Sequence, residues 1–393
     1  MRVLFLSPLL PYPLFSGGQI RAFNLIKELS QSHQITLFSF IRSEEERRYL
    51  PQLQKFCSKI VLRKRRKAWT PFNVLLTGFS YYPFLMSLYW DPVFTKMINE
   101  ELIDGKYDLI HVETFYLMHT LPSTTLPIVL SEQNIEYLVF KRFAERANLI
   151  FKLFLYFDVA KLKIWEKFFW QKAKKIVTAS TLDKQIIEKK RAQVSLVPNG
   201  VDLEYFRDLG KKPHNFPTIL FVGNFKWLQN RDAGNFLITE IWPNIRKEIP
   251  GAKLLVVGRD APQKLKEAIV ESGAVLREDV AEITEVYQET DLLLAPIRIG
   301  GGTKFKILEA MEAGIPVVTT KEGIEGLEVK DGQEVLVGET EEELIRGVIK
   351  ILENKKLRVN LAYNARKKIL AEYNWQKIGK ELERVWQEAV KNG

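Results

Sequence analysis

Short apolar runs alternate with amphipathic stretches along almost the whole of this 393-residue chain. The runs are continuously apolar, which is typical of parallel strands covered on both faces. Between them, Ile20–Leu29, Asp232–Ile241 and Lys304–Ala313 are among the stretches with apolar residues at helical spacing. The alternation predicts an α/β fold with parallel sheets. The expected strands are Val3–Ser7, Ile35–Phe40, Lys59–Leu62, Leu109–Val112, Ile128–Ser131, Lys175–Ala179, Ser195–Val197, Ile219–Val222, Lys253–Val257, Val275–Leu276, Leu292–Ala295, Val317–Thr319 and Val335–Val337.

The alternation is interrupted over Pro198–Pro217, where prolines, glycines and polar residues replace the periodic pattern. We place a boundary there, so that residues 1–200 and 201–373 form two doubly wound, Rossmann-like domains. Ligands of such sheets bind beyond the carboxyl ends of the strands, and the two domains are expected to face a cleft. Residues 374–393 form the last segment, whose helical pattern Trp375–Val390 is expected to pack back on the first domain.

The net charge of +10 is not spread evenly. Residues 1–200 contain 29 Lys and Arg against 17 Asp and Glu, a net +12, which leaves −2 for residues 201–393. Arg63–Trp69 and Phe140–Lys175 combine these cations with aromatic residues, as elements that lie on anionic membranes do. The alternative is that the aromatic residues are core and the cations a solvated rim. No nucleic-acid recognition motif accompanies the charge, so no nucleic-acid partner is expected.

Composition excludes several kinds of site. One cysteine, Cys57, excludes a disulfide framework, and four histidines leave little for a metal centre, so no metal site is predicted. The apolar N-terminal stretch is short and broken by prolines, unlike a signal peptide. Leu149–Ala160 is too short and too charged to span a bilayer. We therefore expect a cytoplasmic protein, peripheral on the inner face of the membrane.

The most informative stretch for chemistry is Ala295–Gly314, where an expected strand leads through Gly300–Thr303 into an expected helix. Glycines at such a junction let backbone N–H groups approach a ligand, and the helix N-terminus favours an anion. Arg298 and Lys304 flank the glycines with positive charge. The pattern predicts a site for a diphosphate.

Further candidates lie at other strand ends and on this helix. Glu309 lies among apolar helical residues, where its two oxygens suit the vicinal hydroxyls of a ribose, whereas Glu312 is expected to face solvent. Gly17 and Gly18 follow the first strand without the spacing of a dinucleotide fingerprint, and Gly223-Asn224 follows the first strand of the second domain.

Taken together, the motifs resemble those of GT-B glycosyltransferases of family 4 (glycosyl transferases group 1), in particular a subgroup associated with bacterial exopolysaccharide assembly. The matching elements cover nearly the full length. They are PLLPYPLFSGGQIR (Pro8–Arg21), DLIHVE (Asp108–Glu113), SEQNIE (Ser131–Glu136), VPNGVD (Val197–Asp202), FVGNFKWLQNRDA (Phe221–Ala233), APIRIGGGTKFKILEAMEAGIPVV (Ala295–Val318) and GIEGL (Gly323–Leu327).

The resemblance implies a nucleotide-sugar donor held mainly by the C-terminal domain, an acceptor bound mainly by the N-terminal one, retention of anomeric configuration, and no metal or other cofactor. Glu309 matches the family glutamate that contacts the ribose, and Gly18 matches the loop that closes on the diphosphate. Gly301, Gly302 and Thr303 match the loop at the donor sugar and phosphates, and Gly223, Asn224 and Arg298 complete the expected donor side. Gly17, Glu132 and Asn134 are expected on the acceptor side.

The sequence departs from the family pattern at several positions. Gly301 stands where the first glutamate of the E-x7-E motif is usual, and Asn224 and Asn230 stand near the usual arginine and lysine. We expect Lys304 to supply the compensating charge, with Lys226 and Arg298 as alternatives. His111 fits one histidine slot of the family and Glu113 takes the place of another, so both are candidate catalytic residues, together with Lys304.

The expected activity is a retaining glycosyl transfer from a nucleotide sugar to a glycan or lipid-linked acceptor, in the biosynthesis of cell-surface polysaccharide. Two other interpretations stay open at this point. The glycine at position 301 is compatible with a non-catalytic sugar-nucleotide-binding scaffold, and the architecture is shared with sugar-nucleotide epimerases.

Overall fold

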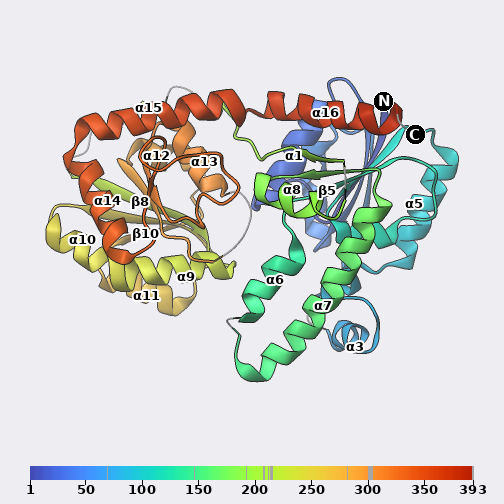
Figure 1. Cartoon of the computed structure of the whole chain (residues 1–393), viewed down its shortest axis with the longest axis horizontal. Helices are drawn as coiled ribbons and strands as arrows, with labels where there is room; N and C mark the ends of the chain where they lie inside the picture. The colour runs from blue at the N-terminus through green and yellow to red at the C-terminus, as the bar shows by residue number, and fades with distance from the viewer. Residues whose placement is uncertain are drawn as a thin grey trace. The chain divides into compact units, whose positions relative to one another are not determined.

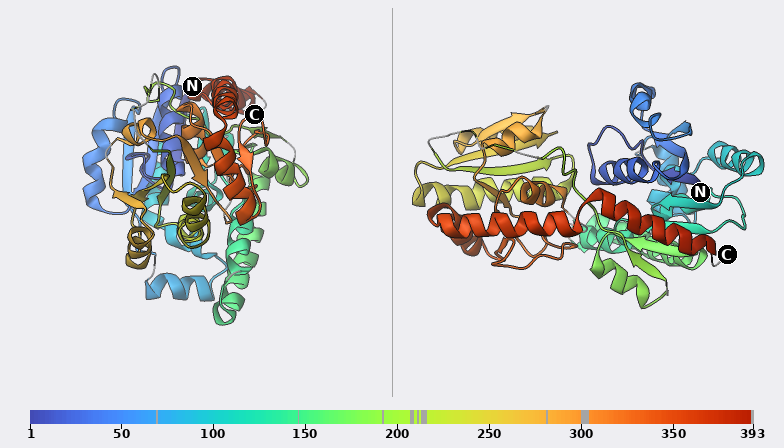
Figure 2. Two further views of the ribbon diagram at one scale, coloured as in Figure 1. Left: turned by 90° about the vertical axis from the view of Figure 1, so that its left-hand side faces the viewer. Right: turned by 90° about the horizontal axis from the view of Figure 1, so that it is seen from above.

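The computed structural model describes residues 1–68, 70–145, 147–191, 193–206, 209–210, 212, 216–280, 282–299 and 304–391. The chain divides into two compact units. Unit 1 comprises Met1–Pro198 and Trp375–Gly393, and unit 2 comprises Asn199–Asn374. Each unit is a parallel sheet with helices on both faces (Figures 1 and 2), as the strand–helix alternation predicts.

The sheet of unit 1 has seven parallel strands in the order β3-β2-β1-β4-β5-β6-β7. From β1 the chain builds outward through β2 and β3, and then returns to place β4 on the other side of β1. The sheet therefore reverses its direction of growth between β1 and β4. The strands are β1 Arg2–Ser7, β2 Gln34–Ile41, β3 Lys59–Lys64, β4 Leu109–Glu113, β5 Ile128–Glu132, β6 Lys175–Thr178 and β7 Val194–Leu196.

Local signals account for the helix boundaries of unit 1. Asp91 caps α5 by accepting hydrogen bonds from two backbone N–H groups, with Pro92 in the first turn. Ser180 caps α8 in the same way. The helical elements are α1 Gly17–Leu29, η1 Glu44–Tyr49, α2 Leu50–Leu53, α3 Pro71–Phe79, α4 Phe84–Tyr89, α5 Pro92–Asp104, η2 Phe115–Thr120, α6 Glu136–Glu145, α7 Leu149–Lys172, α8 Thr181–Glu188 and α16 Trp375–Lys391.

Unit 2 repeats the arrangement with six parallel strands in the order β10-β9-β8-β11-β12-β13. Its sheet reverses direction between β8 and β11. The strands are β8 Thr218–Asn224, β9 Lys253–Arg259, β10 Val275–Glu278, β11 Leu292–Ala295, β12 Val317–Thr319 and β13 Leu336–Val337. The helical elements are α9 Leu228–Phe236, η3 Leu237–Ile241, α10 Trp242–Glu248, α11 Gln263–Glu271, α12 Ile283–Gln288, α13 Phe305–Glu312, α14 Glu341–Glu353 and α15 Lys355–Glu372.

The C-terminal helix α16 packs on unit 1, as its apolar stripe predicts. Ile378, Leu382, Val385 and Trp386 are buried, and the helix lies against α1 and strands β4 to β6. Gly379 permits a close approach, because a Cβ there would lie 2.9 Å from the Cβ of Glu28. Residues more than 300 positions from the N-terminus thus belong to the core of the first unit.

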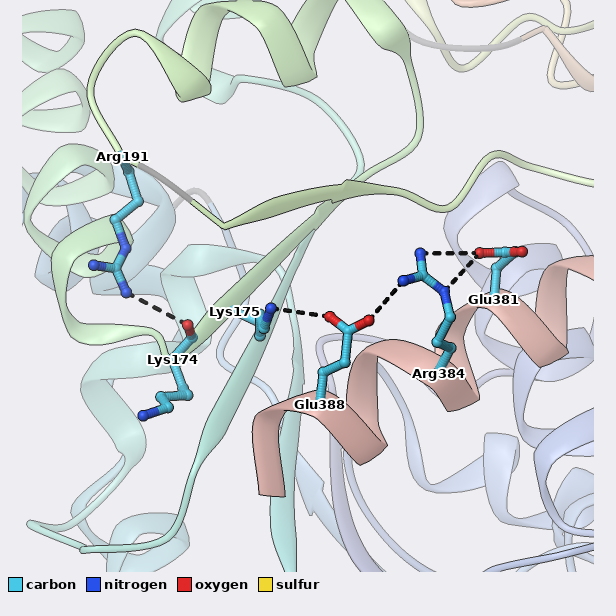
Figure 3. Close-up of polar contacts among 6 residues, drawn as sticks. All are labelled: Lys174, Lys175, Arg191, Glu381, Arg384 and Glu388. Atoms are coloured by element: carbon cyan, nitrogen blue, oxygen red, sulfur yellow. Dashed lines mark hydrogen bonds and ion pairs between the residues drawn. The ribbon is translucent and has the colours of Figure 1, made fainter. Parts of the chain in front are cut away.

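Ion pairs fix the outer side of α16 (Figure 3). Glu388 accepts from Lys175 of β6 at 3.0 Å through one carboxylate oxygen and from Arg384 at 2.6 Å through the other. Arg384 also reaches Glu381 at 3.3 Å. In the same view, Arg191 donates to the backbone oxygen of Lys174, which ties the segment before β7 to the start of β6. The Lys175–Glu388 pair ties the helix to β6, and the Arg384 pairs lie within the helix itself.

Among the described helices none is long and apolar enough to cross a bilayer.

We expect Trp386→Ala to lower the free energy of unfolding by about 3–5 kcal/mol, because it removes a fully buried indole from between α16 and the sheet. Urea unfolding of purified protein measures the change. Gln387→Ala alters the next residue of the same helix at an exposed position and should cost less than about 0.5 kcal/mol. Equal, small effects of both substitutions would show that α16 does not stabilise unit 1.

Candidate functional site

Most of the predicted site residues lie where the two sheets reverse direction. In unit 2, Gly223 and Asn224 end β8, and Arg298 follows β11, its neighbour in the sheet. In unit 1, Glu113 ends β4, beside β1. Ligands of doubly wound sheets bind outside the carboxyl ends of the strands at this reversal, because the crossovers diverge there and leave the strand ends uncovered.

The end of β8 is closed by Asn230, from the first turn of α9. Its side-chain amide donates to the backbone oxygen of Asn224 at 2.8 Å, and its carbonyl accepts from Lys306 Nζ at 2.8 Å. Gly223 favours this contact, since a Cβ at that position would lie 3.1 Å from the Asn230 side chain and press it outward. The Lys306 ammonium also lies 4.9 Å from the centroid of the Phe221 ring.

Lys306 is a candidate that the sequence analysis missed in favour of Lys304. Burial, helped by the neighbouring positive charge of Lys304, lowers the pKa of Lys306 from 10.5 to about 7, while Glu309 opposes the shift. A signal was available in the sequence, because Lys306 precedes Glu309 by three residues and so shares its helical face. The structure thus brings a desolvated cation and a carboxylate together on α13.

Glu309 lies on the described part of α13 and is oriented by a tyrosine. Tyr287 donates its hydroxyl proton to Glu309 Oε2 at 3.3 Å. Burial raises the pKa of Glu309, and the Tyr287 hydrogen bond and the Lys306 charge act against this shift. Glu312, expected to face solvent, is instead only 1% exposed and lies 3.6 Å from Arg366. It packs beneath α15 because the side of α13 that carries it faces that helix.

The remaining donor-side candidates differ in their surroundings. Arg298 makes a two-pronged contact with Asp232, at 3.1 and 2.9 Å, and its guanidinium lies 4.0 Å from the Phe236 ring centroid, so much of its charge is already compensated. Lys304 is the N-cap residue of α13, which begins at Phe305. Gly301, Gly302 and Thr303 lie outside the described residues.

In unit 1 the two β4 candidates form a buried pair. His111 Nε2 lies 3.2 Å from Glu113 Oε1, and neither side chain has exposed surface. Trp386 of α16 donates to His111 Nδ1 at 3.1 Å. An indole nitrogen can only donate, so Nδ1 accepts and the imidazole proton resides on Nε2, facing Glu113. The C-terminal helix therefore sets the tautomer of His111.

The second oxygen of Glu113 is held by Gln133, which the sequence analysis passed over between Glu132 and Asn134. Gln133 Nε2 donates to Glu113 Oε2 at 2.8 Å. Burial alone would raise the pKa of Glu113, but the hydrogen bond from His111, the nearby Arg21 charge and the Gln133 amide hold it below its usual value. Glu113 is therefore a buried carboxylate that stays ionised.

Gln133 also links this carboxylate to the N-terminal glycine pair. Gly17 and Gly18 begin α1, and a Cβ at position 18 would lie 3.1 Å from Gln133 Oε1. Arg21, one turn further along α1, is 1% exposed and donates to the backbone oxygen of Pro198 at 3.0 Å. The glycine pair, Gln133 and Glu113 thus come together as one group.

In the described part of the chain, the side chains of Glu132 and Asn134, the acceptor-side candidates on either side of Gln133, make no hydrogen bond to this group. Glu132 is 1% exposed and accepts from the indole of Trp170 at 2.8 Å, inside the fold. Burial raises the pKa of Glu132 well above its usual value, and it raises the pKa of the nearby Glu166 in the same way. Asn134 is partly buried, and its Oδ1 has no hydrogen-bond partner in the described part of the chain. Glu132 is the last residue of β5, whereas Gln133 and Asn134 lie in the bend between β5 and α6.

The described residues contain no group of three or more His, Cys, Asp or Glu side chains placed to hold a metal ion.

Comparisons with known proteins agree with the fold. Two family models match, "Glycosyltransferase Family 4" over residues 15–205 and "Glycosyl transferases group 1" over residues 216–354, so that together they span most of the chain. An uncharacterised 44.6 kDa protein in a cps region of Klebsiella pneumoniae is 23% identical, over 96% of this chain and 97% of that protein.

Solved structures show the same architecture. Sucrose-phosphate synthase of Thermosynechococcus elongatus superposes with a TM-score of 0.75 at 16% identity, over the full length of both chains. Anabaena Alr3699/HepE, in complex with UDP-glucose, gives a TM-score of 0.66 at 15% identity, over 99% of this chain and all of that one. With the order of its two parallel sheets and the family models that match both halves, the chain belongs to the family 4, group 1 glycosyltransferases of GT-B fold.

Proposed function

We propose that this protein is a retaining glycosyltransferase that moves a sugar from a nucleotide-sugar donor to a glycan or lipid-linked acceptor in the biosynthesis of cell-surface polysaccharide. The observation that carries the proposal is the pairing of Lys306 with Asn230 beside Glu309, at the reversal point of the unit 2 sheet. The Klebsiella pneumoniae relative from a cps region and the UDP-glucose complex of HepE support it.

On the donor side, Glu309 would accept hydrogen bonds from the two ribose hydroxyls, with Tyr287 orienting the carboxylate. Lys306 would lie against the diphosphate, because Asn230 holds its ammonium at the end of β8. Lys304, at the start of α13, would add a second cation. We include Gly301, Gly302 and Thr303 in the proposed site through the family resemblance alone.

The proposed transfer requires that the leaving nucleoside diphosphate be stabilised. When the sugar departs, negative charge develops on the outer phosphate of the nucleoside diphosphate while the sugar gains oxocarbenium character. A preorganised donor at such a position contributes about 3–4 kcal/mol to catalysis. Two lysines and the N–H groups at the start of α13 would meet this demand, and we propose a transfer that uses no metal ion.

On the acceptor side, we propose that the ionised Glu113 orients the acceptor hydroxyl or the donor sugar at the end of β4. His111 would act through Glu113, because its Nδ1 is bound by Trp386 and its Nε2 faces the carboxylate. Gln133 would complete this arrangement and set the position of the Gly17-Gly18 turn. We place the reaction at the inner face of the cytoplasmic membrane, where a lipid-linked acceptor is met.

Lys306→Met should weaken the binding of UDP roughly ten- to hundredfold, since it removes a charge-assisted contact to the diphosphate. Isothermal titration calorimetry with UDP and with uridine separates the phosphate contribution from that of the nucleoside. Lys304→Met provides the matched comparison two residues earlier, at the N-cap of the same helix. A larger loss in Lys304→Met than in Lys306→Met would return the principal role to Lys304.

The affinity for UDP should depend on pH through Lys306. Its pKa of about 7 in the free protein means that the ammonium loses its proton as the pH rises above about 7, so the attraction to phosphate declines. Between about pH 7 and pH 9 we expect affinity to fall up to tenfold per unit, with uptake of a proton on binding. Lys306→Met should bind weakly at every pH, and a wild-type affinity that stays constant over this range would remove Lys306 from the diphosphate site.

Glu113→Gln should lower kcat for glycosyl transfer by roughly 10²- to 10⁴-fold while UDP affinity stays within about twofold, because the donor diphosphate is assigned to unit 2. Glu166→Gln, another buried glutamate of unit 1, is the control. Transfer from a panel of nucleotide sugars to an endogenous membrane extract provides the assay. Tight nucleotide-sugar binding with no transfer to any acceptor would favour the scaffold interpretation instead.

A further inference from the structure

Two neighbouring elements of unit 1 expose large apolar side chains. They are the hairpin formed by α6 and α7, which projects from the sheet in Figure 1, and α3 with the turn that follows it. Leu149 and Leu153 of α7 are 84% and 83% exposed, and Phe79 and Tyr81, at the end of α3 and in the following turn, are 90% and 89% exposed. Together with Phe157 and Phe168, which are about half exposed, they form what we call the apolar face.

The exposed apolar side chains of α7 form one continuous stripe. At about 100° per residue, Leu149, Leu153, Phe157, Ile164 and Phe168 fall within one stripe roughly 100° wide. In a helix of a soluble domain such a stripe faces the core, but here all of these side chains are exposed. A stripe of this kind that remains uncovered marks a surface for binding another apolar body.

Side-chain contacts hold α3 and α7 together as one surface. Lys161 of α7 donates to the backbone oxygens of Thr77 and Ser80, at 2.5 and 2.6 Å. Trp165 donates its indole N–H to the backbone oxygen of Tyr81 at 2.8 Å. Because the carbonyl groups that end α3 are satisfied by α7, Phe79 and Tyr81 are fixed beside the stripe.

The exposed charges of α7 itself all have one sign, whereas α6 ends in an exposed acid, Glu145, which lies 3.7 Å from Lys141. The sequence of α7 contains five lysines and two acidic residues, Asp158 and Glu166, and both acids are buried, at 5% and 0% exposure. Lys163 and Lys167 lie along one edge of the stripe, and Lys161 and Lys172 lie along the other, as their positions on the helical wheel require. A stripe of exposed leucine and phenylalanine between lysines matches the apolar interior and the anionic surface of a lipid leaflet.

We propose that the apolar face of α3 and α7 docks on an anionic phospholipid bilayer. The lysines would lie among the phosphate groups, and Leu149, Leu153, Phe79 and Tyr81 would enter the boundary with the acyl chains. The proposal concerns only the surface by which the protein binds the membrane. It does not depend on which reaction the enzyme performs, so a failure of either proposal leaves the other intact.

Of the two basic segments that the sequence suggests for a membrane contact, the proposal keeps Phe140–Lys175, which contains α7, and not Arg63–Trp69. In the Arg63–Lys67 cluster, Arg63 binds Asp91 at 2.7 Å, and Arg65 donates to the Tyr89 hydroxyl at 3.3 Å. These arginines hold β3 against α4 and α5, so neutralising the cluster would disturb the fold. The lysines of α7 are the better probes.

The experiment is flotation of the full chain with vesicles of phosphatidylcholine, with or without phosphatidylglycerol. We expect wild type to float with the anionic vesicles and not with phosphatidylcholine alone. The double variant Lys163→Gln/Lys167→Gln should partition roughly 25-fold more weakly, at about fivefold per cation. Leu149→Ser/Leu153→Ser should lose roughly tenfold or more for each leucine, and the exposure of both side chains keeps folding unaffected.

Helix α15 of unit 2 supplies matched controls, since it also carries exposed lysines and apolar residues. Val359→Ser/Leu370→Ser and Lys356→Gln/Lys367→Gln change the same kinds of side chain and should float as wild type does. Equal losses in these controls, or full flotation of the α7 variants, would overturn the proposal. A different result would also overturn it: a wild-type protein that binds no vesicles and is a dimer by light scattering, and that Leu149→Ser/Leu153→Ser converts to a monomer.

Discussion

The parallel arrangement of both sheets is the constraint from which the rest of the molecule follows. Parallel strands require helical crossovers, and the crossovers leave each sheet at its carboxyl edge. Where the strand order reverses, between β1 and β4 and between β8 and β11, neighbouring crossovers diverge. Ligands of such sheets bind at these two places, and Glu113 and Asn224 end strands there. The position of the candidate sites therefore follows from the topology of the two sheets, and the particular residues come second.

Burial then decides what those side chains can do. Glu113 is buried and Lys306 is half-buried, yet the pKa of the carboxyl is held below its usual value whereas the pKa of the ammonium falls to about 7. The difference lies in their partners: Glu113 accepts hydrogen bonds on both carboxylate oxygens. Lys306 instead has one neutral amide, a second lysine near it, and the Glu309 carboxylate, which offsets the effect of burial only in part. A cation that is poorly satisfied in the free protein is one that an anionic ligand can complete, whereas a carboxylate with two donors is rigidly placed.

Much of the fold could be predicted from the sequence, because continuous apolar runs and helical spacing are local patterns. All of the expected strands are present, from Val3–Ser7 to Val335–Val337, with ends shifted by a few residues at most. The amphipathic stretch Trp375–Val390 correctly indicated α16 and its return to the first domain. Prediction was poorer for side-chain roles. Lys306 was missed because Lys304 lies nearer the glycines in the sequence. Glu312 was expected in solvent because the residues around it do not indicate that α15 covers it.

The sequence by itself determined the class of fold, the reversal of charge between the halves and the family to which the chain belongs, because each of these depends on residue types and their spacing. Only the tertiary structure decided which polar groups meet. The bond from Trp386 to His111 joins residues 275 positions apart, and the contact between Lys306 and Asn230 spans 76. It also decided that the aromatic residues of α7 divide into buried and exposed sets. Burial and hydrogen bonding depend on distances between elements far apart in the chain, which no local pattern contains.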